Sequence, residues 1–251
     1  MKNLSSVVWS EGMYLGPHHF QAQRSYFEDL IHFSTAALSF ESYGLVGYEM
    51  DSEALQNGTL SVVHARGIFP DGLAFHMPEC DPLPPPRSIA ESFPPARESL
   101  GILLVVPRRM PNSANFALSE TESSESVRYL AEACTMHDEN TGRDEKPVRL
   151  GRKNIRFALE TEDHNDFVSL PLARVIRDGS GNFVYDTNFI PPCLQIAASE
   201  RLMMMSRRLI DILEEKSALL SKTGRGAAKG LGGYSGHEVM IFWYLHSINS
   251  S

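Results

Sequence analysis

The feature that most restricts the fold of this chain is a succession of short apolar runs between residues 43 and 191. The runs are rich in β-branched or aromatic residues, and they cover residues 45–50, 60–69, 102–106, 155–159 and 167–176. Turn-forming residues separate them, which is typical of strands joined by short connections. We therefore predict a mostly antiparallel β domain.

One connection between two of these strands has the composition of a β-hairpin turn. Residues 178–181 read Asp-Gly-Ser-Gly and lie between the apolar stretches 172–176 and 183–185. Such turn residues favour the tight reversal of a hairpin, so we expect these two strands to pair. Residues 82–95 are rich in proline and residues 137–147 are polar and charged, which predicts two exposed loops.

Two regions outside the strands have the pattern of helices. In residues 18–38, apolar side chains recur at near-helical spacing, and Pro17 stands just before them. Residues 199–222 contain long, unbranched helix formers without Gly or Pro. The glycine-rich residues 224–233 predict a loop. Residues 235–238, Ser-Gly-His-Glu, have the spacing of a capping box, so we expect a further helix that the chain leaves incomplete.

Charge, cysteine content and the N-terminus argue against several classes of protein. The formal net charge is −8, whereas a protein that binds nucleic acid concentrates Lys and Arg. Cys80, Cys134 and Cys193 are far apart and odd in number, so they indicate neither a disulfide framework nor a metal-binding pair. The N-terminus lacks the apolar core of a signal peptide, and no run approaches the ~20 apolar residues of a membrane-spanning helix. We predict a cytoplasmic protein with no nucleic-acid partner and no direct membrane insertion.

The sequence carries no recognisable motif of a metal site or of an enzyme. His18 and His19 are adjacent, but successive helical residues point about 100° apart, and no third ligand follows at a supporting interval. The glycine-rich stretch from Gly224 follows a predicted helix rather than a strand, unlike a phosphate-binding loop. Neither a Gly-x-Ser-x-Gly motif nor a reactive cysteine context occurs. An active site assembled from distant residues would leave no motif, but nothing indicates one, and we predict no catalysis, metal or cofactor.

The strongest signal lies near the N-terminus, where residues 8–23 read VWSEGMYLGPHHFQAQ. This segment resembles the opening signature of the TssK family of type VI secretion proteins, which is close to V-x-W-x-E-G-M-x-L-x-P-Q-H-F-Q-x-Q. His18 stands where the family commonly has glutamine, and both side chains form hydrogen bonds. Residues 189–192 (FIPP) and 242–249 (FWYLHSIN) resemble the domain junction and the second middle-region helix of that family.

The resemblance implies a mainly β fold with additional α-helices. Members of the family have an N-terminal β-sandwich, similar to the shoulder domain of a phage receptor-binding protein, followed by a helical neck. We therefore expect residues 1–192 to form the shoulder domain, including the N-terminal helix, and residues 193–251 to form the neck region. Because the family continues beyond this length, the resemblance also implies that the neck is truncated and the C-terminal domain is absent.

The same resemblance implies a structural function in the type VI secretion baseplate. Family members are homotrimers whose N-terminal domain binds the wedge formed by TssF and TssG. They contact the membrane complex of TssL, TssM and TssJ through the C-terminal domain, so we expect this contact only through the missing part. The expected location is the cytoplasm, at the inner face of the cell envelope. The alternative is a phage-like carbohydrate-binding module, which the sandwich architecture alone suggests.

Large apolar groups around a Gly-Pro turn near a chain end are suited to anchoring a partner protein. From this pattern and the resemblance, we predict that the wedge-binding residues are Trp9, Glu11, Gly12, Met13, Tyr14, Leu15, Pro17, His19, Phe20 and Gln21. The alternative for the same residues is that they only hold the N-terminus against the sandwich.

An apolar stripe in the predicted helix 199–222 points to self-association. Its members fall at alternating steps of three and four, and a single helix cannot bury them against itself. With the neighbouring Leu213, we predict that the trimer interface consists of Leu202, Met205, Leu209, Ile212, Leu213 and Leu219. Lys216 occupies one position of this stripe, where a charge lowers stability but helps to set the register. The alternative is a helical hairpin within one chain, closed by the loop at residues 224–233.

Overall fold

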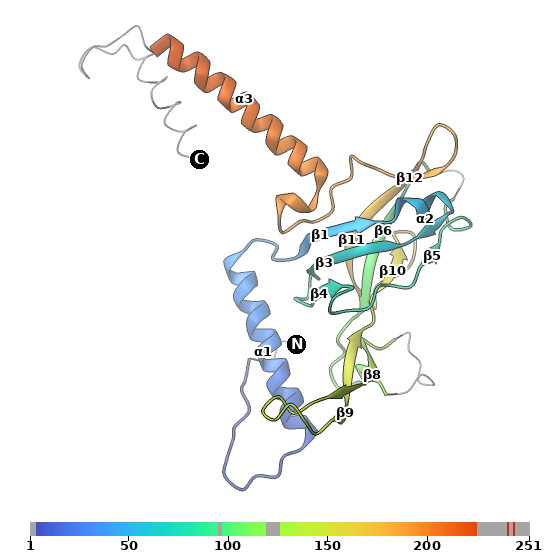
Figure 1. The fold of residues 1–251 in the computed structure, drawn as a ribbon, viewed down its shortest axis with the longest axis vertical. Helices are drawn as coiled ribbons and strands as arrows, with labels where there is room; N and C mark the ends of the chain where they lie inside the picture. The colour runs from blue at the N-terminus through green and yellow to red at the C-terminus, as the bar shows by residue number, and fades with distance from the viewer. Residues whose placement is uncertain (1–3, 95–96, 119–125, 225–239, 241–242, 244–251) are drawn as a thin grey trace, which may run out of the picture. The chain divides into compact units, whose positions relative to one another are not determined.

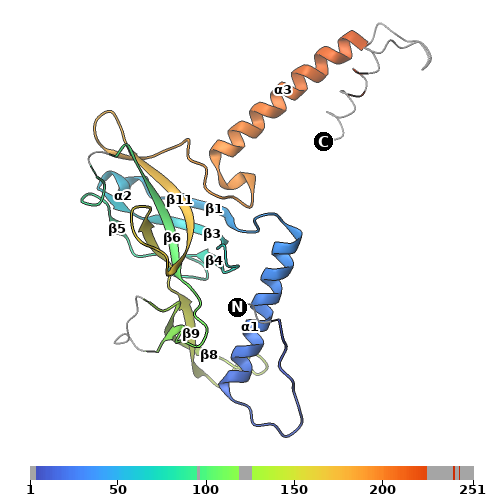
Figure 2. The ribbon, with the colours of Figure 1, turned by 180° about the vertical axis from the view of Figure 1, so that it is seen from behind.

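The structure is a computed structural model that describes residues 4–94, 97–118, 126–224, 240 and 243. The chain divides into two compact units, Met1–Ser199 and Glu200–Ser251. We describe each unit by itself (Figures 1 and 2).

The described part of the first unit contains four β-sheets. A three-stranded sheet has the order β1-β3-β4, with β1 Gly44–Met50, β3 Val62–Ile68 and β4 Ala74–Met77. A four-stranded sheet has the order β10-β6-β11-β12, with β10 Arg156–Leu159, β6 Ser99–Pro107, β11 Phe167–Arg177 and β12 Phe183–Tyr185. Two small sheets join β2 Thr59–Leu60 to β5 Arg87–Ser88, and β7 Phe116–Ala117 to β8 Tyr129–Met136 and β9 Lys146–Lys153. Among the strands of the described residues only β7 and β8 pair in parallel, and Leu45 of β1 also forms an isolated parallel bridge with Cys193. The other strand pairs are antiparallel, so the predicted mostly antiparallel character is confirmed.

Four helical segments accompany the sheets in the described residues. They are α1 Pro17–Leu38, α2 Ser52–Gln56, the short 3-10 helix η1 Ile196–Ala198 and α3 Glu200–Gly224. The predicted helices at residues 18–38 and 199–222 are thus confirmed as α1 and α3. None of the described helices is both long enough and apolar enough to cross a lipid bilayer. The glycine loop after Gly224 lies outside the described residues. Of the helix predicted from residue 235, the structure describes only Met240 and Trp243, and both are helical.

One hydrophobic core draws side chains from both of the larger sheets. In β6, Leu100, Ile102 and Leu104 are fully buried and alternate with more exposed neighbours, as a strand with one face inward requires. Val62 of β3 and Leu170 of β11 join the same core. The fold is therefore mostly β with few helices, and its stability rests on apolar burial between sheets.

The predicted hairpin between β11 and β12 is confirmed. Val175 pairs with Tyr185 and Arg177 pairs with Phe183. In the turn, the Asp178 carboxylate accepts hydrogen bonds from the backbone N–H groups of Ser180 and Asn182 at 2.8 and 2.9 Å. The turn chemistry that the sequence indicated is thus realised through one carboxylate.

The prediction for residues 82–95 is wrong in part. Ile89 and Phe93 of this segment are 0% and 2% exposed, and both belong to the core. Phe93 also lies 5.6 Å, between ring centroids, from Phe183 of the β11–β12 hairpin. Each apolar residue stands isolated among prolines and polar residues, so no periodic pattern signals that it is buried.

The hairpin arm formed by β8 and β9 was not predicted as a pair of strands. Its turn coincides with the polar residues 137–147, which are exposed as predicted. The end of this range is not loop, because strand β9 begins at Lys146. Both views show the arm extending from the larger sheets toward the first half of α1. Since most of β9 is exposed, its sequence lacks the apolar alternation that marks a buried strand.

Candidate protein-binding surface

The N-terminal segment, residues 4–16, is an irregular extended chain that ends at helix α1. A turn bends it near its middle, where the Met13 N–H donates to the Ser10 carbonyl at 3.4 Å. Gly12 in this turn has a φ of +78°, a conformation that L-residues with side chains adopt with difficulty. A Cβ atom at Gly12 would have no heavy atom within 4 Å, so the backbone conformation rather than space requires glycine.

The start of α1 holds this segment close to the helix. Gly16 is the N-cap and Pro17 the first helical residue, and the Gly16 N–H donates to Nδ1 of His19 at 3.1 Å. The Trp9 ring lies 6.1 Å from the His19 ring and 6.4 Å from the Phe20 ring, between centroids. The structure thereby brings Trp9, His19 and Phe20, three of the predicted wedge-binding residues, into one aromatic cluster.

Most of the predicted wedge-binding residues present their side chains to solvent. Tyr14 is 90% exposed, Phe20 is 60%, Leu15 is 53% and Trp9 is 49%. The remaining residues are exposed or half-buried, and they are Glu11, Gly12, Met13, Pro17, His19 and Gln21. None of the ten belongs to the hydrophobic core of the sheets. The prediction omitted Val8, which is 83% exposed on the same segment.

The apolar surface continues along α1 beyond the predicted residues. Phe27, Ile31 and Leu38 are 51%, 63% and 88% exposed, and with Phe20 they recur at steps of seven, four and seven. Residues at such steps share one side of a helix. We call Phe20, Phe27, Ile31 and Leu38 the α1 stripe. Apart from Phe20, which was also predicted to bind the wedge, sequence reasoning used these residues only to recognise the helix, because periodicity does not indicate whether a neighbour covers the stripe.

Charged and polar contacts connect α1 to the rest of the first unit. Arg109 lies between two carboxylates of α1, 3.3 Å from Asp29 Oδ1 and 3.6 Å from Glu28 Oε2. The guanidinium of Arg24 lies 5.1 Å from the centroid of the Phe116 ring. A side chain at Gly72, in the β3–β4 connection, would clash with the His32 ring. The helix therefore turns its polar side toward the sheets and leaves its apolar stripe uncovered in this chain.

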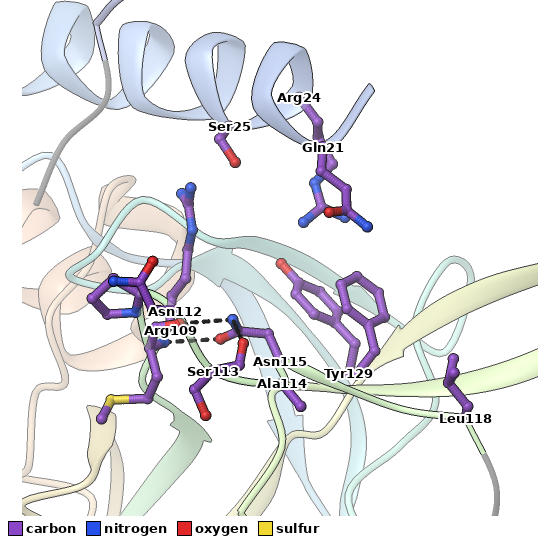
Figure 3. Close-up of a pocket in the computed structure, with 13 residues that line it drawn as sticks. Gln21, Arg24, Ser25, Arg109, Asn112, Ser113, Ala114, Asn115, Leu118 and Tyr129 are labelled. Carbon is purple, nitrogen blue, oxygen red and sulfur yellow. Dashed lines mark hydrogen bonds between the residues drawn. The ribbon is translucent and has the colours of Figure 1, made fainter. Parts of the chain in front are cut away.

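A groove lies between the first half of α1 and residues 109–118, with a volume of about 570 Å³. In Figure 3, Gln21 and Arg24 point from α1 toward Tyr129 on the other side of the groove. Phe116 and Tyr129 form its floor, with rings stacked 4.7 Å apart at an angle of 19°. We call this space the α1 groove.

The wall of the α1 groove is held by one asparagine. Asn115 accepts a hydrogen bond from the Met110 N–H at 2.8 Å and donates to the Met110 carbonyl at 2.9 Å. Apart from Gln21, the groove residues were not predicted as site residues. They come from three segments spread over more than a hundred positions, and no sequence motif connects them.

The predicted trimer interface occupies an uncovered face in the described part of α3. Leu209 and Leu219 are each 57% exposed, Met205 is 52% and Ile212 is 38%, while Leu202 and Leu213 are half-buried. The stripe predicted from the sequence is thus present on a helix.

The residues weighed for metal binding or reactivity form no centre in the described part of the chain. No group of three His, Cys, Asp or Glu side chains lies close enough there to hold a metal ion. His18 is exposed, and His19 is engaged at the start of α1. The three cysteines are free thiols, and burial raises the pKa of Cys193. The absence of catalysis and of a cofactor stays a prediction.

Sequence comparisons relate this chain to bacterial secretion proteins. Residues 19–251 match the profile of a family described as bacterial type VI secretion proteins and including EvfL, ImpJ and VasE. TssK1 of Pseudomonas aeruginosa, a type VI secretion system baseplate component, is 31% identical over 245 residues, or 97% of this chain and 53% of that protein. The chain therefore spans about half the length of this curated relative.

Solved structures show the same fold. A crystal structure of TssK is similar with a TM-score of 0.79 and 28% identity, over 98% of this chain and 54% of that one. TssK in the TssK-TssF-TssG baseplate subcomplex, determined by cryo-electron microscopy, gives a TM-score of 0.82 at 24% identity, over 98% and 77% of the two chains. Sheets and helices in the present chain thus follow an arrangement that is already known.

Proposed function

Because the chain belongs to the type VI secretion family of VasE and TssK, we propose that it is a structural component of a secretion baseplate that binds a TssF–TssG wedge. The contact is assigned to the N-terminal segment and the beginning of α1. The observation that carries this proposal is the cluster of uncovered large side chains at Trp9, Tyr14, Leu15 and Phe20. Aromatic and large apolar groups gathered in this way are typical of the energetic centre of a protein interface.

The burial pattern supports a binding role for this segment. Side chains that served only to hold the N-terminus in place would lose most of their exposure against the sheets. Tyr14 and Leu15 instead keep more than half of theirs. Burying such groups in a partner removes apolar surface from water, which favours association.

The test is binding of purified TssF–TssG complex to the double variant Trp9→Ala, Leu15→Ala. Losing a hot-spot side chain costs about 2 kcal/mol or more, so affinity should fall by at least tens of fold. The matched control is Val63→Ala, Leu83→Ala, because these side chains are 48% and 42% exposed elsewhere in the same unit. Wedge capture by the folded Trp9/Leu15 variant at the level of the control would refute the assignment.

We further propose that the protein is a homotrimer, joined through the predicted trimer-interface residues of α3, which we call the α3 stripe. In this proposal the larger sheets form a two-layer sandwich corresponding to the shoulder domain, and α3 corresponds to the neck. The exposed fraction of Leu209 supports self-association, since burying such a stripe between helices removes apolar surface from water.

Light scattering at micromolar concentration tests the oligomeric state. The expected mass is about three times the chain mass of 28.0 kDa. Leu209→Asp with Ile212→Asp should give a monomer, while Arg207→Asp with Asp211→Lys, on the same helix but outside the stripe, should leave the mass unchanged. A wild-type mass of one chain contradicts the proposal.

The proposed location is the cytoplasm, at the inner face of the cell envelope. We propose that contact with the membrane complex of TssL, TssM and TssJ requires a C-terminal domain that lies outside residues 1–251. Parallel pull-downs with the wedge and with the membrane complex test this division. The first should capture the protein and the second should not.

A further inference from the structure

The α1 groove has an unusual balance of charge for a chain with a net charge of −8. Its lining contains two arginines, Arg24 and Arg109, and no Asp or Glu. The other polar lining groups are neutral hydroxyls and amides, on Gln21, Ser25, Asn112, Ser113, Asn115 and Tyr129. The lining therefore offers guanidinium, hydroxyl and amide groups and no carboxylate, while Glu28 and Asp29 of α1 lie beside the two guanidinium groups from outside the lining.

Both arginines are oriented by neighbours that leave part of each guanidinium available. Arg24 Nε lies 3.3 Å from Glu28, and its guanidinium lies over the stacked rings of Phe116 and Tyr129, at 5.1 and 5.8 Å from their centroids. Arg109 uses one terminal nitrogen, Nη1, toward Asp29 and Glu28. Within the described residues, neither terminal nitrogen of Arg24 donates a hydrogen bond, and neither do Nε and Nη2 of Arg109.

Such partly used guanidinium groups suit one kind of ligand. A carboxylate accepts two parallel N–H bonds from a guanidinium, and this charge-assisted pairing is stronger than a neutral hydrogen bond. Arg24 and Arg109 are 43% and 34% exposed, so a ligand reaches them without unfolding the groove. Asn115 and the aromatic floor fix the walls, which limits the ordering needed when a ligand binds.

We propose that the α1 groove binds an Asp or Glu side chain from an acidic segment of the wedge, an inference that rests on the proposed function. Gln21 argues for the wedge as the source, because it lies both in the predicted wedge-binding segment and in the lining of the groove. The net charge of −8 disfavours an acidic segment over most of this chain, whereas the groove offers guanidinium N–H groups that can still donate to a carboxylate. The groove therefore sets the register of the wedge, while the N-terminal apolar residues supply most of the affinity.

The test compares purified wedge binding to Arg24→Gln, Arg109→Gln and Trp9→Ala at low and high salt. At low salt, each arginine variant should bind about tenfold more weakly than wild type, because a charge-assisted pair is lost. Between about 50 mM and about 300 mM salt, wild-type affinity should fall more steeply than that of the arginine variants, because salt screens exposed charges. Trp9→Ala should keep the wild-type salt dependence.

Matched controls separate the groove from general charge effects and from misfolding. Arg149→Gln removes an exposed arginine from β9, outside the groove, and should leave wedge affinity unchanged. Arg24→Lys keeps the charge but loses the planar pair of donors, and should restore only part of the affinity. A polyglutamate peptide should compete with the wedge on wild type but not on Arg24→Gln, and a neutral Gly-Ser peptide of equal length should not compete.

The outcomes distinguish this inference from the proposed function. Failure of wild type to bind the wedge removes both. Wedge binding by the folded arginine variants with wild-type affinity and salt dependence overturns the groove proposal alone. The chain has its own glutamates at Glu120, Glu122 and Glu125. These glutamates can be replaced with Gln, alone and together with Arg24→Gln. If the two changes lower the unfolding free energy non-additively and neither alters wedge affinity, the carboxylate in the groove comes from the chain itself. That result also overturns the proposal.

Discussion

The sheets and the N-terminal region of this chain use the same kinds of side chain in opposite ways. Leu104 in β6 and Leu170 in β11 are 0% exposed, whereas Tyr14 before α1 is 90% exposed and Phe27 within α1 is 51% exposed. An apolar strand is buried because other side chains of the shared core pack against it. An apolar helix face stays uncovered when the chain offers it no such neighbour. The comparison shows that apolar pattern identifies an element, while its surroundings determine whether it stabilises the fold or is available to a partner.

The two regions also differ in the interactions that hold them in place. The sheets are joined by a continuous apolar core and backbone ladders, whereas ion pairs and an arginine over aromatic rings attach α1. Salt screens exposed ion pairs, whereas apolar burial is not screened and is strengthened by salts such as sulfate. The attachment of α1 should consequently weaken at high salt under conditions where the sheets remain folded.

The largest expected contrast is between truncations in the two regions. Leu104→Ala should lower the unfolding free energy by about 3 kcal/mol, because it opens a cavity in a packed core. Tyr14→Ala removes a larger side chain, but it should change that free energy by less than about 0.5 kcal/mol. Urea unfolding followed by circular dichroism measures both. Equal costs for the two variants would show that the N-terminal segment contributes to the same core.

The second contrast compares two glycines. A Cβ atom at Gly67 would lie 2.4 Å from the Gly44 carbonyl oxygen, so Gly67→Ala forces β1 and β3 apart. We expect it to lower the unfolding free energy by about 2 kcal/mol. Gly12→Ala meets no clash, and its strain is confined to a segment outside the core, so its effect on unfolding should stay below about 0.5 kcal/mol.

For wedge affinity we expect the opposite order of effects, with Gly12→Ala more harmful than Gly67→Ala. Gly12→Ala should weaken binding several-fold because it alters the turn between Trp9 and Leu15. Folded Gly67→Ala should bind as wild type does. If Gly12→Ala left both unfolding and wedge binding unchanged, the turn would have no role in presenting the segment.

The third contrast concerns ion pairs in the two regions. Arg128 of the first unit is 4% exposed, donates to the Pro107 carbonyl at 2.8 Å and lies 2.6 Å from Asp71 Oδ2. Asp71→Asn should cost about 2 kcal/mol of unfolding free energy, because it leaves a buried guanidinium without its counter-charge. Asp29→Asn weakens the attachment of α1 and should cost about 1 kcal/mol or less.

Hydrogen exchange separates the local effects of these two substitutions. Asp29→Asn should accelerate exchange in α1 while leaving β6 and β11 protected, because α1 can loosen without opening the core. Asp71→Asn should accelerate exchange in β6 and β11 through its effect on global stability. Accelerated exchange in those strands with Asp29→Asn would mean that the core and α1 unfold as one unit.

The smallest expected effect is a pH dependence confined to the sheets. Burial acts to raise the pKa of Glu162, but hydrogen bonds from the Arg87 guanidinium and the Leu159 N–H outweigh it, so the pKa is lowered. Because the pKa is lower in the folded state, the stabilisation is present above the unfolded pKa of about 4.3 and is lost as pH falls through the folded value. Glu162→Gln should therefore be less stable than wild type at neutral pH, and the difference should shrink on acidification. Glu91→Gln, at an exposed carboxylate, is the control, and a difference from wild type that does not change with pH would contradict the argument.

Helices and strands could be predicted from the sequence better than the neighbours that cover each side chain. Helix α3 and the β11–β12 hairpin followed from local composition, because helix formers and turn residues act over a few neighbouring positions. Ile89 and Phe93 were missed because isolated apolar residues carry no periodicity. The β8–β9 arm was missed because exposed strands need no alternating pattern.

The candidate surface was predictable only in part. The N-terminal segment was found through its resemblance to a family signature. The α1 groove was not found, because Arg24, Arg109 and Tyr129 meet only after the chain has folded. Exposure could not be predicted either, since it depends on which element lies opposite each side chain.

The junction after the sheets has a consequence for the order in which the domain folds. The Leu45 N–H donates to the Pro192 carbonyl at 2.8 Å, and the Leu194 N–H donates to the Leu45 carbonyl at 2.8 Å. These bonds join positions about 150 residues apart, and the closure of such a long loop carries an entropy cost that only an otherwise assembled domain offsets. During synthesis on the ribosome, β1 must therefore wait for almost the whole domain before this edge pairing forms. The α1 stripe is uncovered during that period, as it is in the folded chain, so the waiting chain exposes apolar surface at both β1 and α1.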